Sequence, residues 1–212
     1  LLFTINLPGY GERKGEAVIT DWDLLVKNVT KVILQTAADS EKFKQCNTIH
    51  FVGNGFGALL AWKTLLQIQI YEDEDKDVPI ISTLIISRVV APTAERPIQL
   101  AGEVISKLPP EGIRLFLEMI GSKVDFEGEK AYLLPIIHNE YAMMDSVTNE
   151  NDMKIRSKLL VLSGKQDKII NENNTSLWKK EVSDEFSEFT QHIKMRGDHW
   201  FMMKDTTKYL KN

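Results

Sequence analysis

The feature that most constrains this chain is a glycine-rich turn between an apolar strand and an apolar helix. Thr48–Val52 is a β-rich run, Gly53-Asn54-Gly55-Phe56-Gly57 follows it, and Gly57–Ile70 has a helical pattern. Alternate glycines permit a sharp turn and a close approach of the helix to the strand. A strand that turns at once into a helix is typical of βαβ units, so the sequence predicts an α/β fold with a mostly parallel sheet.

Strand-like and helix-like segments alternate along most of the chain, which predicts helices on both faces of that sheet. Strands are expected at Leu2–Leu7, Thr48–Val52, Ile80–Val90, Lys158–Ser163 and Phe189–Met195, and helices at Thr20–Ala38, Gly57–Ile70, Asn173–Val182 and His199–Leu210.

Residues 98–150 break this alternation. They show helical patterns at Ile98–Leu108, Gly112–Gly121 and Gly128–Ser146 and no clear strand. We therefore expect one domain, with the core formed by residues 1–97 and 151–212 and with residues 98–150 as a helical lid insertion.

Composition and charge argue against several classes of protein. The net charge of −4 and the pI of about 5.7 argue against a nucleic-acid binder, and no apolar run is long enough to span a membrane. A single cysteine, Cys46, allows no disulfide framework, so we expect an intracellular protein, in the cytoplasm or an organelle. His50, His138 and His192 show no metal-ligand spacing. The acidic run Glu72–Asp77 fits a solvated loop better than a metal site, because nothing else converges on it in the sequence, so no cofactor is expected.

The first residues suggest that the chain begins inside a folded core. Leu2–Leu7 is strand-like, and neither an initiator methionine nor a basic leader precedes it. We expect earlier residues, including edge strands of the sheet, to be absent.

The glycine-rich turn has three interpretations. In α/β-hydrolases a Gly-x-Ser-x-Gly turn of this kind, the nucleophile elbow, presents the catalytic serine, and here Gly55 would take the serine's place. A phosphate-binding loop is a second interpretation, but the Gly-x-Gly-x-x-Gly spacing and the Gly-Lys-Ser/Thr ending are both missing. The third is an ordinary βα turn without a function.

Two later residues favour the hydrolase interpretation. Asp167 follows the strand Lys158–Ser163 in a Gly-x-x-Asp sequence, and His199 follows the strand Phe189–Met195. In the chain order nucleophile, acid, base, Asp167 would accept a hydrogen bond from Nδ1 of His199 and orient it towards position 55. Each residue alone also fits a turn or a structural histidine; together and in this order they favour a triad scaffold.

Several collinear segments resemble the type II thioesterases that accompany polyketide and nonribosomal peptide synthetases. Leu7–Arg13 is similar to that family's LPGRGxR segment, Gly53–Ala61 to GHSMGALLA, Ser87-Arg88 with Ala91-Pro92 to SGxxAP, Leu134-Pro135 with His138–Tyr141 to LPxxRADF, and Gly164, Asp167, Gly197 and His199–Phe201 to GxxD and GxHFF.

The resemblance implies hydrolysis of acyl thioesters on acyl carrier proteins or coenzyme A. Serine would attack the thioester, histidine would take its proton and the amide of Phe56 would provide one oxyanion donor. The chain departs from the pattern at Asn54, at Gly55 and at the segment that would supply the second donor. Because loss of the nucleophile typically costs on the order of a million-fold in kcat, we expect no activity as written.

Three hypotheses of function follow: a thioesterase that has lost its serine, a non-catalytic module that binds an acyl group or carrier protein, and a structural subunit of a larger assembly. Apolar residues of the expected lid could line an acyl pocket or simply form the lid's own core. They are Ile98, Leu108, Ile113, Leu115, Phe116, Met119, Leu133, Ile136, Met143 and Met144.

Overall fold

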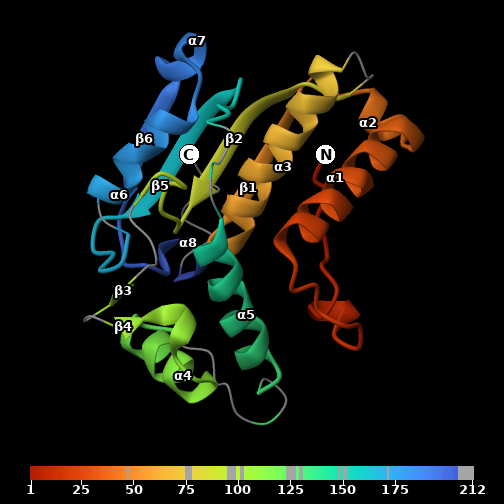
Figure 1. Ribbon diagram of the computed structural model, residues 1–212. Helices are drawn as coiled ribbons and strands as arrows, with labels where there is room; N and C mark the ends of the chain where they lie inside the picture. Colours follow the sequence, from red (N-terminus) through yellow and green to blue (C-terminus); the bar gives the residue numbers. More distant parts are fainter. Residues whose placement is uncertain are drawn as a thin grey trace.

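A four-stranded parallel sheet forms the centre of the protein (Figure 1). The computed structural model describes residues 1–46, 48–74, 78–94, 99–100, 103–122, 128, 131–147, 149, 152–170 and 172–204. The strand order is β1-β2-β5-β6, with β1 at Ile49–Asn54, β2 at Ile81–Ser87, β5 at Lys158–Gly164 and β6 at Thr190–Met195. Because all four strands run in the same direction, their carboxyl ends meet at one edge of the sheet.

Two long helices cover one face of the sheet. α3, Phe56–Asp73, lies directly on β1 and β2, and α1, Trp22–Asp39, packs on α3 (Figure 1). The Asp21 carboxylate caps α1 by accepting a hydrogen bond from the Leu24 amide. α3 is apolar around most of its circumference because it is enclosed between the sheet and α1. Its Trp62 is fully buried against Trp178, with ring centroids 6.4 Å apart.

The opposite face of the sheet is more open. Val52 on β1 is 63% exposed and Ile193 on β6 is 41% exposed. The sequence predicts helices on both faces of the sheet. α1 and α3 cover the first face, whereas Val52 and Ile193 on the second face remain in contact with solvent.

A helical segment lies beyond the carboxyl ends of the strands (Figure 1). It contains α4, Pro110–Met119, and α5, Leu133–Ser146, preceded by the 3-10 helix η2 at Ile105–Lys107. These elements share a small core of their own, formed by Ile105, Ile113, Phe116, Leu117, Ile120 and Leu134.

Short elements complete the fold. They are η1 at Gly11–Arg13, α2 at Glu41–Lys44, the antiparallel pair β3 and β4 at Gln99–Leu100 and Glu103–Val104, α6 at Glu172–Ser176, η4 at Leu177–Glu181, α7 at Asp184–Ser187 and α8 at Phe201–Lys204. No helix within the described residues has the length and the hydropathy needed to cross a membrane.

Two of the expected elements are wrong. Leu2–Leu7 forms no strand; it pairs with none of the described strands, Leu2 is 83% exposed, and Phe3 packs on Phe43 instead. A strand exists only through hydrogen bonds to a neighbour, which a β-rich composition does not supply. The helix expected at Ile98–Leu108 is replaced by the β3–β4 pair and η2, so the segment 98–150 does contain strands; Ile98 itself lies outside the described residues.

The acidic run after α3 also differs from the expected solvated loop. α3 continues to Asp73, and Arg156 forms ion pairs with Glu72 and Asp73 at 2.9 and 2.8 Å. The loop expected at the end of this run, residues 75–77, lies outside the described residues.

Candidate active site

The carboxyl ends of the four strands each place one chemically distinctive residue near a common cavity. Gly55 follows β1, Arg88 follows β2, Asp167 follows β5 and His199 follows β6. Ligand sites in parallel α/β sheets lie at this edge, because the loops that follow the strands meet there.

The turn after β1 is built by glycines with different roles. Gly55 has φ 58° and ψ −123°, a conformation that side-chain-bearing residues rarely adopt, and its amide donates a hydrogen bond to the Ser87 carbonyl at 2.8 Å. At Gly53 an added Cβ would lie 2.4 Å from the Gly57 carbonyl oxygen, so only glycine lets α3 approach β1 this closely. At Gly55 and Gly57 an added Cβ would meet no atom within 4 Å. A serine side chain at position 55 therefore has room, at the cost of backbone strain.

The structure brings Asp167 and His199 together. Nδ1 of His199 lies 2.9 Å from Oδ2 of Asp167, and both side chains are almost completely buried. The other carboxylate oxygen, Oδ1, accepts hydrogen bonds from the amides of Ile169 and Ile170 at 2.9 and 3.0 Å. Burial raises the pKa of Asp167, but the hydrogen bond and charge of His199 and the two amides outweigh burial, so the pKa lies below its ordinary value. Asp167 is thus an ionised acceptor that fixes the orientation of the imidazole.

A close approach holds the His199 loop in place. At Gly164, the last residue of β5, an added Cβ would lie 2.3 Å from the carbonyl oxygen of Asp198. The Gln166 amide also donates to the Gly197 carbonyl at 2.9 Å. The loop after β5 and the loop after β6 are therefore packed backbone to backbone, which sets the distance between Asp167 and His199.

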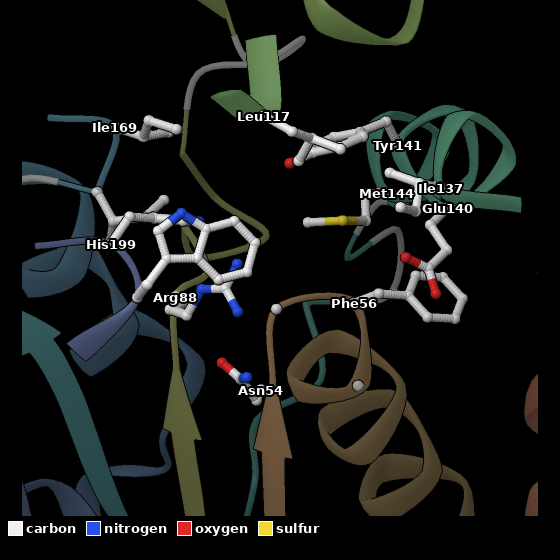
Figure 2. Close-up of a pocket in the computed structure, with 14 residues that line it drawn as sticks. Asn54, Phe56, Arg88, Leu117, Ile137, Glu140, Tyr141, Met144, Ile169 and His199 are labelled. Carbon is white, nitrogen blue, oxygen red and sulfur yellow. The ribbon is translucent and has the colours of Figure 1, made fainter. Parts of the chain in front are cut away.

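A cavity of about 250 Å³ opens at this edge of the sheet, between the strand ends and the helices α4 and α5 (Figure 2). Its strand side is mainly polar and its helix side is mainly apolar. The lining residues are Asn54, Gly55, Phe56, Gly57, Arg88, Leu117, Ile137, Glu140, Tyr141, Met144, Ile169, Ile170, His199 and Trp200.

Three of the sequence-predicted site residues line this cavity: Gly55, Phe56 and His199. The fourth, Asp167, does not line it but lies 2.9 Å from Nδ1 of His199. Phe56 is the first residue of α3, so its amide is one of those that no carbonyl within the helix can satisfy. Asn54 is directed to its neighbour strand, where its Oδ1 accepts a hydrogen bond from the Ser87 hydroxyl at 2.9 Å.

Two further residues of the site were not anticipated as functional. Arg88 stacks its guanidinium on Trp200, with Cζ 4.0 Å from the ring centroid, and burial lowers its pKa although Tyr141, Asp167, Glu140 and Asp198 partly offset this. The only signal in the sequence is that Arg88 stands where the SGxxAP pattern has glycine.

Glu140 on α5 is the second unanticipated residue. Its Oε1 accepts a hydrogen bond from the Tyr10 hydroxyl at 2.5 Å, across 130 residues of sequence. Burial raises the pKa of Glu140 to about 7, although the hydrogen bond from Tyr10 and the charge of Arg88 act in the opposite direction. Glu140 therefore changes charge near neutral pH on the wall of the cavity.

Within the part of the chain that the structure describes, no cluster of three or more histidine, cysteine, aspartate or glutamate side chains could hold a metal ion. The polar chemistry of the site consists of the Asp167–His199 pair, Arg88, Glu140 and the start of α3.

Comparison with known proteins places the fold. No protein-family model matches the chain, and no curated protein matches it in sequence. Among solved structures, the chain is similar to the type II thioesterase BorB from the borrelidin biosynthetic cluster, with a TM-score of 0.71 and 18% identity over 96% of this chain and 76% of that one. The type II thioesterase YbtT from the yersiniabactin NRPS/PKS pathway gives a TM-score of 0.72 and 16% identity over 97% and 77%.

ClbQ from the colibactin NRPS/PKS pathway matches with a TM-score of 0.69 and 18% identity over 96% of this chain and 80% of that one. A lipase-esterase related protein from Clostridium acetobutylicum matches with a TM-score of 0.66 and 18% identity over 96% and 78%. The four-stranded parallel sheet with flanking helices thus has the α/β-hydrolase fold, similar to the fold of these solved structures.

Proposed function

We propose that this protein is a thioesterase-like α/β-hydrolase whose cavity accepts an acyl group but whose catalytic triad lacks the nucleophile. The observation that carries the proposal is the buried Asp167–His199 pair, 2.9 Å between Oδ2 and Nδ1, in which His199 lines the same cavity as Gly55. In this proposal Gly55 holds the nucleophile position, His199 is the general base and Asp167 orients it.

The chemistry follows from the hydrogen bonds. Because Nδ1 of His199 is engaged by Asp167, Nε2 is the nitrogen left to remove a proton from a nucleophile. Gly55 has no hydroxyl or thiol from which a proton could be removed. The amide of Phe56 would stabilise a carbonyl oxygen in the cavity whether or not a covalent bond forms. An acyl thioester would therefore bind without being cleaved at an enzymatic rate.

The proposed ligand is an acyl thioester carried by an acyl carrier protein or by coenzyme A. Support comes from the neighbours BorB and YbtT, which are type II thioesterases from biosynthetic pathways, and from the apolar helix side of the cavity. Leu117, Ile137 and Met144 on that side could contact a hydrocarbon chain.

The test restores the nucleophile. Gly55→Ser is expected to hydrolyse a panel of acyl-coenzyme A and acyl-carrier-protein substrates, whereas the native protein does not. Adding His199→Ala to Gly55→Ser should abolish this activity. The matched control adds His192→Ala, since His192 interacts with Ser163 at 2.7 Å and does not line the cavity. Absence of turnover in folded Gly55→Ser, or turnover that survives His199→Ala, contradicts the proposal.

A second candidate is a structural or binding subunit of a larger assembly that uses the hydrolase fold as a scaffold. The observation that favours it is the open face of the sheet, where Val52 is 63% exposed. Parallel sheets ordinarily have both faces covered, so this face suits a protein partner. In that case Gly55→Ser would remain without activity and the native protein would bind no acyl thioester.

A further inference from the structure

Arg88 is held in a backbone conformation that is unfavourable for arginine. It follows β2 directly with φ 57°, and among the described residues only Asp152 is another non-glycine residue with positive φ. Glycine occupies this position in the SGxxAP pattern, and glycine would be free of the strain. Strain of this kind persists where the surrounding structure needs the side chain, and here the side chain is directed into the cavity (Figure 2).

Within the described residues Arg88 forms no ion pair, although Asp167, Glu140 and Asp198 lie near enough to act on its charge. Its Nε is buried and has no hydrogen-bond partner, and the guanidinium rests on the face of Trp200. The two acids closest to the site are already engaged, since Asp167 binds His199 and Glu140 accepts from Tyr10. A partly buried guanidinium with an unsatisfied Nε and no ion-pair partner is unfavourable, so an anion that enters the cavity would find a favourable partner in Arg88.

The position of this charge identifies where the anion would lie. The Gly55 amide is bonded to the Ser87 carbonyl, so Arg88 stands beside the point at which the nucleophile would attack a thioester carbonyl. No side chain fills the space at Gly55, and His199 borders the same space. The amides at the start of α3, an 18-residue helix, add to the positive potential at this place.

The opposite wall of the cavity is apolar. Figure 2 shows Met144 and Leu117 across the cavity from Arg88, with Ile169 to one side. A ligand that satisfies both walls has a planar anionic head and a short hydrocarbon tail. A carboxylate matches the fork of the guanidinium with two parallel hydrogen bonds.

We propose that the cavity binds free carboxylic acids in preference to their thioesters, with the carboxylate on Arg88 and the hydrocarbon chain towards α4 and α5. This inference rests on the acyl cavity of the proposed function and names a different ligand: the acid that thioester hydrolysis releases. A neutral thioester carbonyl at the same place can accept a hydrogen bond from Arg88 but does not neutralise its charge.

The experiment compares isosteric ligands by calorimetry on the whole chain. The probes are hexanoate, hexanamide and S-ethyl hexanethioate. The variants are Arg88→Met, Arg88→Lys and the control Arg114→Met, since Arg114 on α4 does not line the cavity. Wild type is expected to bind hexanoate about 10- to 100-fold more tightly than hexanamide. Arg88→Met should lose this preference while keeping hexanamide affinity, Arg88→Lys should keep part of it, and Arg114→Met should keep all of it. Circular dichroism checks that each variant is folded, and the wild-type comparison needs no variant.

Equal affinity of wild type for hexanoate and hexanamide overturns the inference, as does an acid preference that survives in Arg88→Met. If hexanamide and the thioester bind well in that case, the acyl cavity stands and only the carboxylate assignment fails. If wild type binds none of the three probes, the inference and the proposed acyl cavity both fail. A fourth probe, the mono-S-ethyl thioester of adipic acid, tests whether the carboxylate belongs to the far end of an acyl chain; tighter binding of this probe than of hexanoate overturns the free-acid assignment.

Discussion

Replacement of Glu140 by glutamine is expected to remove a pH-dependent destabilisation of the folded state. Glu140 is held on the cavity wall by the Tyr10 hydroxyl, and burial raises its pKa from 4.5 to about 7. Because the folded state binds the proton more tightly, the contribution of Glu140 to stability is fully present below pH 4.5. It is lost as the pH rises from 4.5 to 7 and stays lost above 7.

The size of the effect follows from the two pKa values. With about 1.4 kcal/mol for each unit of pKa, the shift from 4.5 to about 7 corresponds to about 3 kcal/mol between pH 4.5 and pH 8. Glutamine keeps an oxygen that accepts from Tyr10 but never becomes charged. Glu140→Gln should therefore be close to wild type at pH 4.5 and about 3 kcal/mol more stable than wild type at pH 8.

Urea unfolding followed by circular dichroism at pH 4.5, 5.5, 6.5, 7.5 and 8 measures this difference. The matched control is Glu185→Gln, because Glu185 is exposed on α7 and far from the cavity lining. Its difference from wild type should be small and independent of pH. A Glu140→Gln difference that is flat across this range would refute the assignment of a buried, proton-binding carboxyl group.

Other substitutions test the rest of the site. Gly164→Ala should destabilise the fold by about 3 kcal/mol or more, because its Cβ would meet the Asp198 carbonyl oxygen at 2.3 Å. The control Gly15→Ala should cost little, because its Cβ would meet no atom within 4 Å. Thermal unfolding compares the two variants. Arg88→Gly should raise the free energy of unfolding by about 1 kcal/mol, since it removes the strain of φ 57° and a buried Nε without a hydrogen-bond partner; a lower melting temperature would show that Arg88 stabilises the fold. In a Gly55→Ser background, Asp167→Asn should reduce kcat by about 10⁴-fold while leaving KM nearly unchanged, because His199 would lose its orienting acceptor. Steady-state kinetics that show a change in KM alone would contradict this role.

Much of the fold could be predicted because its signals are local. The strands β1, β2 and β5 are short runs rich in apolar residues, whereas β6 has only Ile193 and Met195 as apolar residues; each strand lies within a few residues of its expected place. The turn Gly53–Gly57 can be recognised from five consecutive residues. Asp167 and His199 lie in the loops that follow β5 and β6. The carboxyl ends of the strands in a parallel sheet meet at one edge. The proximity of this turn, Asp167 and His199 can therefore be predicted from the chain order.

The failures have a physical cause in common, which is dependence on distant partners. Leu2–Leu7 has the composition of a strand, but a strand requires a neighbour with which to pair. The charge state of Glu140 depends on Tyr10, 130 residues away, and on burial that only the folded chain produces. Arg88 is an ordinary surface residue by composition, and only its positive φ and its place beside Gly55 reveal it as part of the cavity.

The apolar residues of the helical segment could either line a cavity or form a core of their own, and different residues do each. Ile113 and Phe116 belong to the core shared by α4 and α5, as expected if the segment packs on itself. Met144 is both buried and part of the cavity wall. For Leu115 and Met119 both interpretations are wrong, since these side chains are 54% and 60% exposed and lie neither in that core nor on the cavity wall. For the buried residues, helical periodicity cannot distinguish a cavity wall from a core, because both are apolar.

The most direct test of the central claim is mass spectrometry of Gly55→Ser after exposure to an acyl-coenzyme A. The account predicts that the peptide containing position 55 gains the mass of the acyl group, because the new hydroxyl stands beside His199, and that Gly55→Ser with His199→Ala does not. A folded Gly55→Ser protein that acquires no acyl group and releases no free coenzyme A would contradict the account.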